Sequence, residues 1–456
     1  MTQRITQQLL FLELNEINFE TVAFYCERGH LPRFRQLIDA HGIQTTVAEQ
    51  RYEDIEPWIQ WVTAHTGLTL AQHGVFRLGD IVTKDLPQIW EQLEDRGLLV
   101  GAISPMNAKH RLRKPAFFVP DPWTTTDITA PKLLQALYQA IVQVVGDNAQ
   151  SRVTLSSIAA LLAGSLWYAR PANYLNYANL ALTSRSHPWR RAVFLDLLLA
   201  DVFIRQVASS KPNFATVFLN AGAHIQHHYM FSAEAYNGPH RNPSWYAPDN
   251  TDPVREIYEF YDSIIGDVQR AFPRARLMLA TGLHQVPHSQ VTYYWRLRDH
   301  AAFLREVGVE FSNVQPLMSR DFLVTCADAE QARRAEELLA GARAADGTSL
   351  FAVDNRGRDL FVMLTYPGEI GGGFTFTLGG AQYSDLKSHV AFVALKNGEH
   401  DSKGYFVDTG APRVTVSDEF PLAEIPKRIF AAFSFGVAER SGCSGSRRAA
   451  QSVQTG

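Results

Sequence analysis

The sequence predicts an α/β fold with a mostly parallel, doubly wound central sheet between helices, a helical cap and a small α+β insertion. Short apolar runs typical of buried strands, such as residues 8–14 and 212–220, alternate with helical patterns. The helical pattern at 189–209 leads directly into the second of these strands, as in a βαβ unit. Polar residues follow both strands, at the sheet edge where open α/β proteins bind ligands.

Composition excludes some classes of protein. The chain has 456 residues, which suffices for one large domain with insertions or for two domains. Its net charge of −3 gives no argument for a nucleic-acid partner or a membrane surface. The cysteines Cys26, Cys326 and Cys443 are too far apart to suggest disulfides or a zinc site, and we expect buried or incidental thiols.

Targeting segments are not evident in the sequence. The N-terminal 18 residues lack a signal-peptide layout, so we expect a cytoplasmic protein. The most apolar internal run, Ile158 to Trp167, is shorter than the roughly 20 residues that span a bilayer, so no membrane span is expected. The small polar residues of 441–456 predict a disordered tail.

The first part of the chain reads as alternating strands and helices. After the strand at 8–14 come a helix, a loop at Gly29–Pro32 and a short helix that ends at Gly42. Residues 43–49 are β-branched and predict an edge strand. Pro57 suits the first turn of a helix that ends at Gly67. This helix lies in the stretch 50–79, on which the polar segments that follow other strands are expected to converge. A helix at 86–97 and strands at 98–104 and 117–123 follow.

The second part of the chain contains the predicted cap and insertion. Residues 130–210 are helical in pattern, and the first two helices are expected to cap the site. A helix at 255–272 precedes a strand at 276–282, and a hairpin turn is expected at Asn355–Gly357. The predicted division is a core of 1–130, 210–290 and 386–440, a cap of 131–209, an α+β insertion of 291–385 and a tail of 441–456.

Histidines cluster near predicted strand ends. On a helix, His224 would share a face with His227 and His228, at spacings of three and four residues, which suits metal ligands. The alternative is a polar helix start with solvated or hydrogen-bonded imidazoles. His284 lies just beyond another strand, and His400 lies in a predicted turn before a strand. Neutral imidazoles with a carboxylate neighbour suit zinc or another transition metal.

Carboxylates occur at the end of the predicted strand at 8–14 and at the start of the predicted helix at Pro57. Glu13 and Asn15 would point to one side of their strand, with Glu16 directly after it. A carboxylate inside a buried strand is costly unless it is paired or binds a cation; an arginine partner is the alternative for Glu13. Glu56 precedes the Pro57 helix, whose N-terminus favours anions. Trp58, on the same face of this helix as Trp61, reads more readily as core than as a substrate platform.

These segments, taken in order, resemble one family. The runs LFLELNEINFE, GHLPRFRQLI, EPWIQWVTAHTGLTLAQHGVF, FLNAGAHIQHHY, LATGLHQ and GEHDSKGYFVDTGA resemble the alkaline phosphatase-like superfamily, nearest to its type I phosphodiesterase/nucleotide pyrophosphatase branch. The most specific parts are Thr66-Gly67 followed by His73-Gly74, and the order of the histidine motifs. The resemblance implies a central sheet between helices, a two-metal site, usually zinc, and a Thr or Ser nucleophile at a helix N-terminus.

The resemblance also implies positions for the family's site residues. The first metal-binding Asp falls on Asn15, and the nucleophile falls at or near Pro57, beside Glu56. The Asp-His pair falls on Leu283 and His284, and the last histidine falls on His400.

The middle Asp-x-x-x-His motif of the family has two registers in this sequence. One register places it on Ala223 and His227, and the other places it on Asn220 and His224. The sequence leaves both registers open.

Charge argues against two metals. Two divalent cations about 4 Å apart need several anionic ligands to offset their repulsion. Asn15 and Asn220 are neutral, and Leu283 offers no ligand. We therefore expect at most one divalent metal, zinc or manganese, and a site without metal is an equal alternative. The expected roles are catalysis for Glu56, Asn15 and Glu16, substrate binding for Trp58, Gln60, Asn220, His224 and Lys403, and metal binding for His227, His284, His400 and Glu13.

Two functions from different classes fit these residues. The first is a divergent phosphodiesterase or phosphotransferase that acts on a phosphate or sulfate ester, with Glu56 as base or electrostatic partner in place of the hydroxyl. The second is a catalytically inactive relative that binds a phosphorylated glycan, a lipid head group or a nucleotide. A metal requirement would favour the first, and ligand-dependent stabilisation without turnover would favour the second.

Overall fold

A mixed α/β sheet forms the centre of the protein. The computed structural model describes residues 7–146, 154–317, 320–414 and 418–433. In order across the eight-stranded sheet lie β17 (Glu419–Pro421), β2 (Gln44–Val47), β16 (Lys403–Asp408), β6 (Arg276–Ala280), β1 (Leu9–Leu14), β5 (Phe214–Leu219), β3 (Val100–Ile103) and β4 (Phe117–Val119). Only β16 runs antiparallel to its neighbours, so the mostly parallel sheet predicted from the sequence is confirmed.

The predicted edge strand at 43–49 is not at an edge. β2 pairs with β16 on one side and with β17 on the other. The edge position is taken by β17, a strand of three residues from near the C-terminus. The sequence of β2 indicates that the strand is half-buried. It does not indicate whether a segment far along the chain pairs with its outer edge.

Helices cover both faces of the sheet because β1 is apolar on both sides. Leu10, Leu12 and Leu14 pack toward one layer, and Leu9 and Phe11 pack toward the other. The first layer contains α1 (Phe19–Glu27), α2 (Pro32–His41), α9 (Arg190–Ser210) and α11 (Pro253–Ala271), and the second contains α3 (Pro57–Thr66), α5 (Ile89–Glu94) and α15 (Ile425–Ala432).

Helix α3 has the boundaries that the sequence predicts. It begins at Pro57, where a missing N–H costs nothing, and ends at Gly67, which adopts a left-handed conformation with φ 73°. Trp61 is fully buried, whereas Trp58 is partly buried and donates from its indole nitrogen to the Phe76 carbonyl at 3.0 Å. The short helix α4 (Leu70–His73) follows.

Buried His73 holds the segment after α3 in place. Its Nδ1 accepts from the Val75 backbone N–H at 3.0 Å, so the neutral ring carries its proton on Nε2, which lies 3.1 Å from Thr63 Oγ1. Burial, with the Lys84 charge, lowers the pKa of His73 to about 4. Protonation would also remove the bond from Val75.

We expect His73 to titrate with a midpoint near pH 4 in the folded protein. Because the folded pKa lies below the ordinary value of 6.5, the stability from neutral His73 is complete above pH 6.5. That stability, about 3 kcal/mol, is lost as the pH falls from 6.5 through 4. Imidazole ¹⁵N chemical shifts followed against pH give the midpoint and the tautomer. A midpoint near 6.5 would contradict the assignment.

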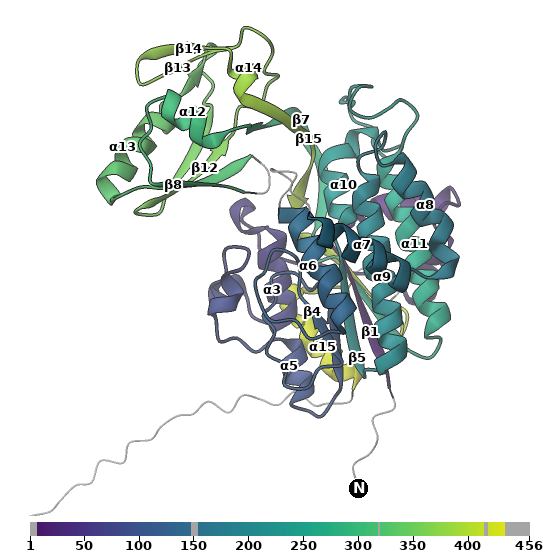
Figure 1. Ribbon diagram of the computed structural model, residues 1–456. Coiled ribbons are helices and arrows are strands. Elements are labelled where there is room, and N and C mark those ends of the chain that lie inside the picture. The colour runs from purple at the N-terminus through teal and green to yellow at the C-terminus, as the bar shows by residue number, and fades with distance from the viewer. Residues whose placement is uncertain (1–6, 147–153, 318–319, 415–417, 434–456) are drawn as a thin grey trace, which may run out of the picture.

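A second domain is inserted through a long two-stranded ribbon. The ribbon consists of β7 (His284–Leu297) and β15 (Val390–Asp401), which pair antiparallel. Figure 1 shows this domain beside the main body, at the far end of the ribbon. The domain contains α12 (His300–Glu306), β8 (Asn313–Pro316), β9 (Asp321–Thr325), α13 (Ala329–Ala340), β10 (Arg343–Ala344), β11 (Phe351–Asn355), β12 (Asp359–Leu364), β13 (Thr375–Leu378), β14 (Ala381–Ser384) and α14 (Leu386–His389).

The inserted domain has an apolar core of its own. Phe322, Val324, Leu360 and Val362 belong to this core, together with Trp295 from the ribbon. The predicted hairpin is present, because β11 and β12 pair antiparallel on either side of its turn. The ribbon itself was not predicted, since its exposed residues interrupt the apolar alternation that marks a strand.

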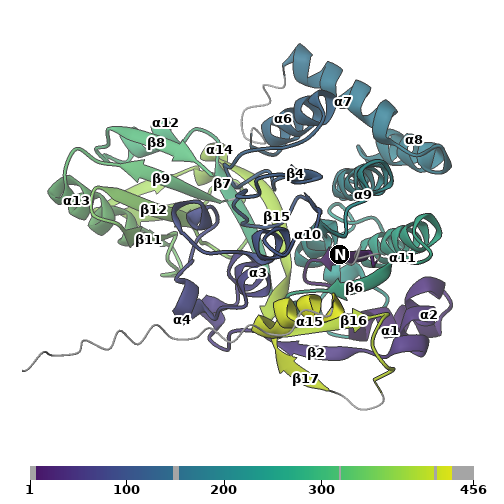
Figure 2. The ribbon, with the colours of Figure 1, turned by 90° about the horizontal axis from the view of Figure 1, so that it is seen from below.

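Three helices lie outside α9, away from the sheet. They are α6 (Lys132–Gly146), α7 (Leu155–Tyr168) and α8 (Tyr174–Thr183), and α8 was not predicted. Figure 2 shows them together along one side of the molecule. Among the described helices, none combines the length and hydropathy needed to cross a bilayer. Cys26 and Cys326 are free and buried, as expected, whereas Cys443 and the tail at 441–456 lie outside the described residues.

Candidate metal centre

Three side chains from distant parts of the chain meet beyond the carboxyl end of β1. One oxygen of Glu16 lies 3.1 Å from His227 Nε2 and 3.2 Å from His400 Nε2. The two Nε2 atoms lie 3.2 Å from each other. Among the described residues, these three form the only cluster of metal-ligating side chains close enough to share an ion.

The spacing of the three donor atoms suits a tetrahedral metal. A metal about 2.0–2.1 Å from each ligand places neighbouring ligand atoms about 3.3 Å apart. The observed separations of 3.1–3.2 Å approach this value. Both histidines are partly exposed, so water and a substrate can reach a fourth position. Two histidines and one carboxylate are ligands that zinc, manganese and iron all accept.

Glu16 reaches the cluster because the chain turns sharply after β1. The residue has φ 61°, in the left-handed region that side chains other than glycine seldom adopt. Its N–H donates to the Thr281 carbonyl at 3.0 Å, and its carbonyl accepts from the Gln226 side chain at 2.8 Å. Backbone strain of this kind is typical of functional sites.

His227 comes from α10 (Ala221–Tyr229), the helix that follows β5. The other ring nitrogen, Nδ1, lies 3.4 Å from the Gly398 carbonyl of the ribbon. A side chain cannot replace the hydrogen of Gly398, because a Cβ there would lie 2.1 Å from Gln285 Oε1. The Gly398 carbonyl favours the tautomer of His227 that carries its proton on Nδ1. The lone pair of Nε2 is then available to a metal.

His400 lies in strand β15, not in the predicted turn. Its Nδ1 lies 3.6 Å from a carboxylate oxygen of Glu56, on the side of the ring away from the cluster. A carboxylate behind a metal-binding imidazole fixes its tautomer and raises its basicity. Glu56 therefore lies where it can orient His400.

Glu16 and His400 each favour the ionised form of the other. Burial opposes ionisation of Glu16, but His400 and His227 together hold the pKa of its carboxyl well below the usual range. Burial likewise opposes charging of His400, but Glu16 and Glu56 raise its pKa above the ordinary value of 6.5. Burial raises the pKa of Glu56. Glu16 is thus anionic at neutral pH.

Asn15 and Asn220 hold the carboxylate of Glu16 in place. The Asn15 amide nitrogen donates to Glu16 Oε1 at 2.9 Å and to Asn220 Oδ1 at 2.8 Å. Asn15 Oδ1 accepts from the Trp61 indole nitrogen at 2.7 Å. Gln285 Nε2 donates to the other Glu16 oxygen at 2.5 Å. Both asparagines thus have partners that give them a positioning role.

The metal roles predicted for Glu13 and His284 are corrected by the structure. Glu13 faces α3 from inside the sheet, where it bonds to Thr216 and lies 3.0 Å from His65 Nε2. Its partner is thus a histidine and not the arginine considered above. His284 Nδ1 lies 2.5 Å from the Lys403 carbonyl, and its ring packs against Tyr405. Neither side chain belongs to the cluster.

Several predicted substrate contacts have other roles in the structure. Gln60 is fully buried and donates to the Asp54 carbonyl at 2.7 Å, so its amide holds a loop. The Trp58 indole nitrogen donates to the Phe76 carbonyl, as described above. The Lys403 ammonium lies 3.2 Å from a carboxylate oxygen of Glu20. His224 is exposed beside His228 and lies outside the cluster, whereas His227 belongs to it. Of the two registers of the middle motif, the one on Ala223 and His227 therefore reaches the site.

A second metal has no comparable ligand set among the described residues. The position that the resemblance assigns to an Asp is Leu283, which is buried and apolar. The hydroxyls of Thr63 and Thr66 are bonded to His73 and to the Val62 carbonyl, and neither faces the cluster. Whether the site binds one metal or none stays a prediction.

A polar cavity of about 470 Å³ lies between the ribbon and the inserted domain. Arg320 and Lys396 supply two cations to its lining, and Tyr294 and Thr292 supply hydroxyls. The Lys396 ammonium lies 3.5 Å from the hydroxyl of Tyr52, which precedes Glu56 by four residues. The volume lies within the roughly 300–1,000 Å³ typical of small-molecule sites. The sequence analysis missed this cavity because its residues come from separate strands.

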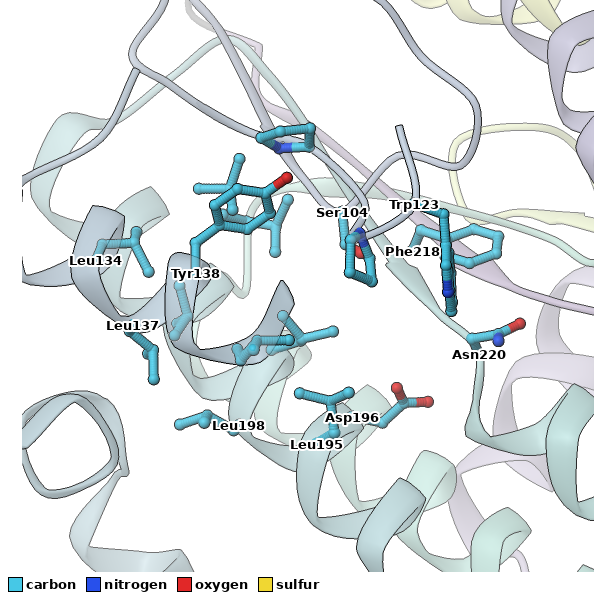
Figure 3. A pocket seen from close by; sticks show the side chains of 17 residues that line it. Ser104, Trp123, Leu134, Leu137, Tyr138, Leu195, Asp196, Leu198, Phe218 and Asn220 are labelled. Carbon is cyan, nitrogen blue, oxygen red and sulfur yellow. The ribbon is translucent and has the colours of Figure 1, made fainter. Parts of the chain in front are cut away.

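A second cavity adjoins Asn220 but is far smaller, at about 50 Å³. Figure 3 shows its mostly apolar walls, with Leu134, Leu137 and Tyr138 of α6 on one side and Asp196 and Asn220 at the polar end. Its volume is well below that of a typical ligand site. We therefore regard it as a packing void beneath α6.

Other residues near the cluster were not predicted. Gln285 and Gln226 bond to Glu16, and Gly398 supplies the carbonyl beside His227. Gln285 directly follows His284 in the run TGLHQ, so its position after a strand was a usable signal. Gly398 had no signal, because the close approach of the ribbon to α10 is a tertiary feature.

The fold and the cluster together define a mixed α/β protein with a candidate mononuclear metal centre. No protein-family model matches the chain, and no curated protein matches it in sequence. Solved structures do match it over nearly its whole length.

Three of these structures are the following. Phosphonoacetate hydrolase from Sinorhizobium meliloti 1021, in complex with phosphonoacetate, is 11% identical, with 94% of this chain and 95% of that chain covered and a TM-score of 0.44. Inactive murine ectonucleotide pyrophosphatase/phosphodiesterase 5, in complex with AMP, is 8% identical, with 94% and 96% covered and a TM-score of 0.42. Alkaline phosphatase from the Antarctic bacterium TAB5 is 10% identical, with 94% and 98% covered and a TM-score of 0.39. With such low identities and TM-scores, we interpret the site from its own residues.

Proposed function

We propose that the chain is a hydrolase of phosphate or sulfate esters that uses one divalent metal, zinc or manganese. The observation that carries this proposal is the triangle of Glu16, His227 and His400, with donor atoms 3.1–3.2 Å apart. A divalent ion held there supplies a Lewis acid for a phosphoryl or sulfuryl oxygen and lowers the pKa of a bound water.

The protein's own residues give this site a particular chemistry. Pro57 stands where the resemblance places a hydroxyl nucleophile, so the chain offers no side chain there to form a covalent intermediate. We infer direct attack by water, with phosphotransfer through the protein disfavoured. His227 and His400 would hold the ion through their Nε2 atoms, and Glu56 and the Gly398 carbonyl lie beside the Nδ1 atoms, where they can orient the two rings.

The polar cavity beside the ribbon is the place that we assign to the remainder of the ester. Its two cations, Arg320 and Lys396, favour an anionic group on the leaving part of the substrate. Burial lowers the pKa of Lys396, and this half-buried cation gains from a bound anion. A phosphodiester with a second anionic group is therefore the substrate class that we favour.

Metal content tests the proposal directly. We expect purified protein to retain close to one equivalent of zinc or manganese, measured by plasma mass spectrometry. His227→Ala and His400→Ala should each lose it, because each removes one of three ligands. His284→Ala is the matched control, since it removes a nearby buried histidine outside the cluster and should retain the metal.

Turnover completes the test. Metal-loaded protein should hydrolyse a nitrophenyl phosphodiester, phosphomonoester or sulfate ester, and a chelator should stop it. A protein that binds no metal, even after incubation with zinc and manganese, would overturn the proposal. Metal bound without turnover of any of these esters would instead favour the inactive, ligand-binding relative.

A further inference from the structure

Helix α7 exposes a continuous apolar stripe. Ile158, Leu162 and Leu166 follow one another every four residues, and their side chains are 43%, 62% and 74% exposed. Trp167 adds an indole that is 56% exposed. Residues four apart lie on the same helix face, so these side chains form one surface.

Helix α8 continues the apolar surface. Tyr174, Leu175 and Leu182 are 49%, 85% and 83% exposed. Figure 2 shows α7 and α8 following one another along the outer side of the molecule, beyond α9. We define the α7–α8 apolar face as Ile158, Leu162, Leu166, Trp167, Tyr174, Leu175 and Leu182. Single exposed apolar residues are ordinary, but a cluster of this kind marks an interaction surface.

The inner sides of the same helices are already packed. Gly164 of α7 lies so close to Leu137 of α6 that a Cβ would come within 2.9 Å of it. Tyr168, Tyr177 and Leu180 are buried against the main body. Helix α7 is thus apolar on its packed side and also on its solvent side. The outer side of an ordinary surface helix is polar. The apolar outer side of α7 is therefore expected to contact another molecule.

The part of the sequence that forms the face carries charges of one sign. Residues 148–195 contain five arginines and no Asp or Glu, a local asymmetry that the net charge of −3 conceals. Two of these arginines are engaged, since Arg170 pairs with Asp201 and Arg190 with Glu256. Arg185 and Arg191 are exposed. In addition, the Arg205 guanidinium lies 4.6 Å from the centre of the Trp167 ring.

We propose that the α7–α8 apolar face docks on an anionic phospholipid surface. The aliphatic side chains enter the boundary between head groups and acyl chains, and Trp167 and Tyr174 lie at the level of the head groups. Arg185 and Arg191 pair with anionic lipids, which attract basic residues near a membrane. The apolar run of α7 is too short to span, so the helix lies in the plane of the surface.

A second copy of the chain is a poorer partner for this face. Two copies that met through it would bring arginines together, and residues 148–195 offer no carboxylate to pair with them. A lipid surface supplies both an apolar layer and the opposite charge. The proposal concerns a surface apart from the candidate metal centre, so its test does not depend on catalysis.

Vesicle flotation of the full-length protein tests the proposal. We expect the protein to float with vesicles of phosphatidylcholine containing about 30% phosphatidylglycerol, and to bind pure phosphatidylcholine vesicles several-fold less. Leu166→Ser/Leu175→Ser should weaken binding at least about tenfold, because it removes two exposed leucines from the face. Arg185→Gln/Arg191→Gln should abolish the preference for anionic vesicles, and salt should have the same effect.

A matched control separates this face from general surface hydrophobicity. Phe76→Ser/Trp245→Ser removes two apolar side chains that are 57% and 63% exposed elsewhere on the protein, and it should bind as the unaltered protein does. The proposal is overturned if the unaltered protein stays unbound, or if the leucine variant binds equally well. A lipid-free dimer that the leucine variant converts to monomer would also overturn it, since the face would then be a protein interface.

Discussion

Replacing Glu16 by Gln is expected to remove the metal and with it the hydrolysis. Glu16 is the only anionic member of the cluster, and each of its oxygens is already held by an amide donor, one from Asn15 and one from Gln285. The neutral amide keeps the volume but loses the charge that offsets a divalent ion. We expect metal affinity to fall by more than about a hundredfold, beyond the usual effect of changing a residue behind a ligand. Metal titration by calorimetry and turnover of a phosphodiester measure both losses.

Glu13→Gln provides the control for Glu16→Gln. Glu13 lies three residues earlier, is equally buried, and bonds to His65 and Thr216 instead of the cluster. Its replacement should keep the metal while lowering stability by about 1–3 kcal/mol, because a buried hydrogen-bond partner is changed. If Glu16→Gln bound metal as the unaltered protein does, the cluster would not be a metal site.

Replacing Glu56 by Gln should weaken metal binding without removing a catalytic base. Its carboxylate faces Nδ1 of His400 at 3.6 Å, on the side opposite to Nε2. Carboxylates in this position contribute about 10–100-fold to metal affinity or activity. We expect the dissociation constant of the metal to rise by this factor. At saturating metal, turnover should largely recover, and the pH–rate profile should keep its acidic limb.

The sequence-based hypothesis of a catalytic Glu56 predicts the opposite result. A general base would leave metal affinity unchanged, and its loss would lower turnover at all metal concentrations and remove the acidic limb. Glu399→Gln is the control, because Glu399 precedes His400 but lies 2.8 Å from His288 Nδ1 instead. It should leave metal affinity near that of the unaltered protein.

The parts of the fold that depend on local pattern were predictable from the sequence. The apolar run at 8–14 gives a fully buried strand, and Pro57 and Gly67 set the ends of α3. The β7–β15 ribbon was missed because exposed residues interrupt the apolar alternation of β7 and because the pairing joins residues about a hundred positions apart. Helix α8 was missed because its outer side is apolar, so the usual contrast between helix faces is absent.

The candidate site was predicted in its residue types more than in its geometry. His227 and His400 were named as ligands, and Glu16 was named as a site residue. Glu13 was favoured for the metal because it is a carboxylate in an apolar strand, yet the alternation of the strand turns it toward His65. Glu16 reaches the histidines only through its left-handed backbone, which no periodic pattern predicts.

The ribbon that carries the inserted domain also carries His400. β15 begins at Val390, beside the core of that domain, and reaches the cluster ten residues later. A rotation of the inserted domain that bends β15 would therefore move His400 relative to Glu16 and His227. Ligand geometry and domain orientation are then linked, and by reciprocity an ion that selects one geometry also selects one orientation.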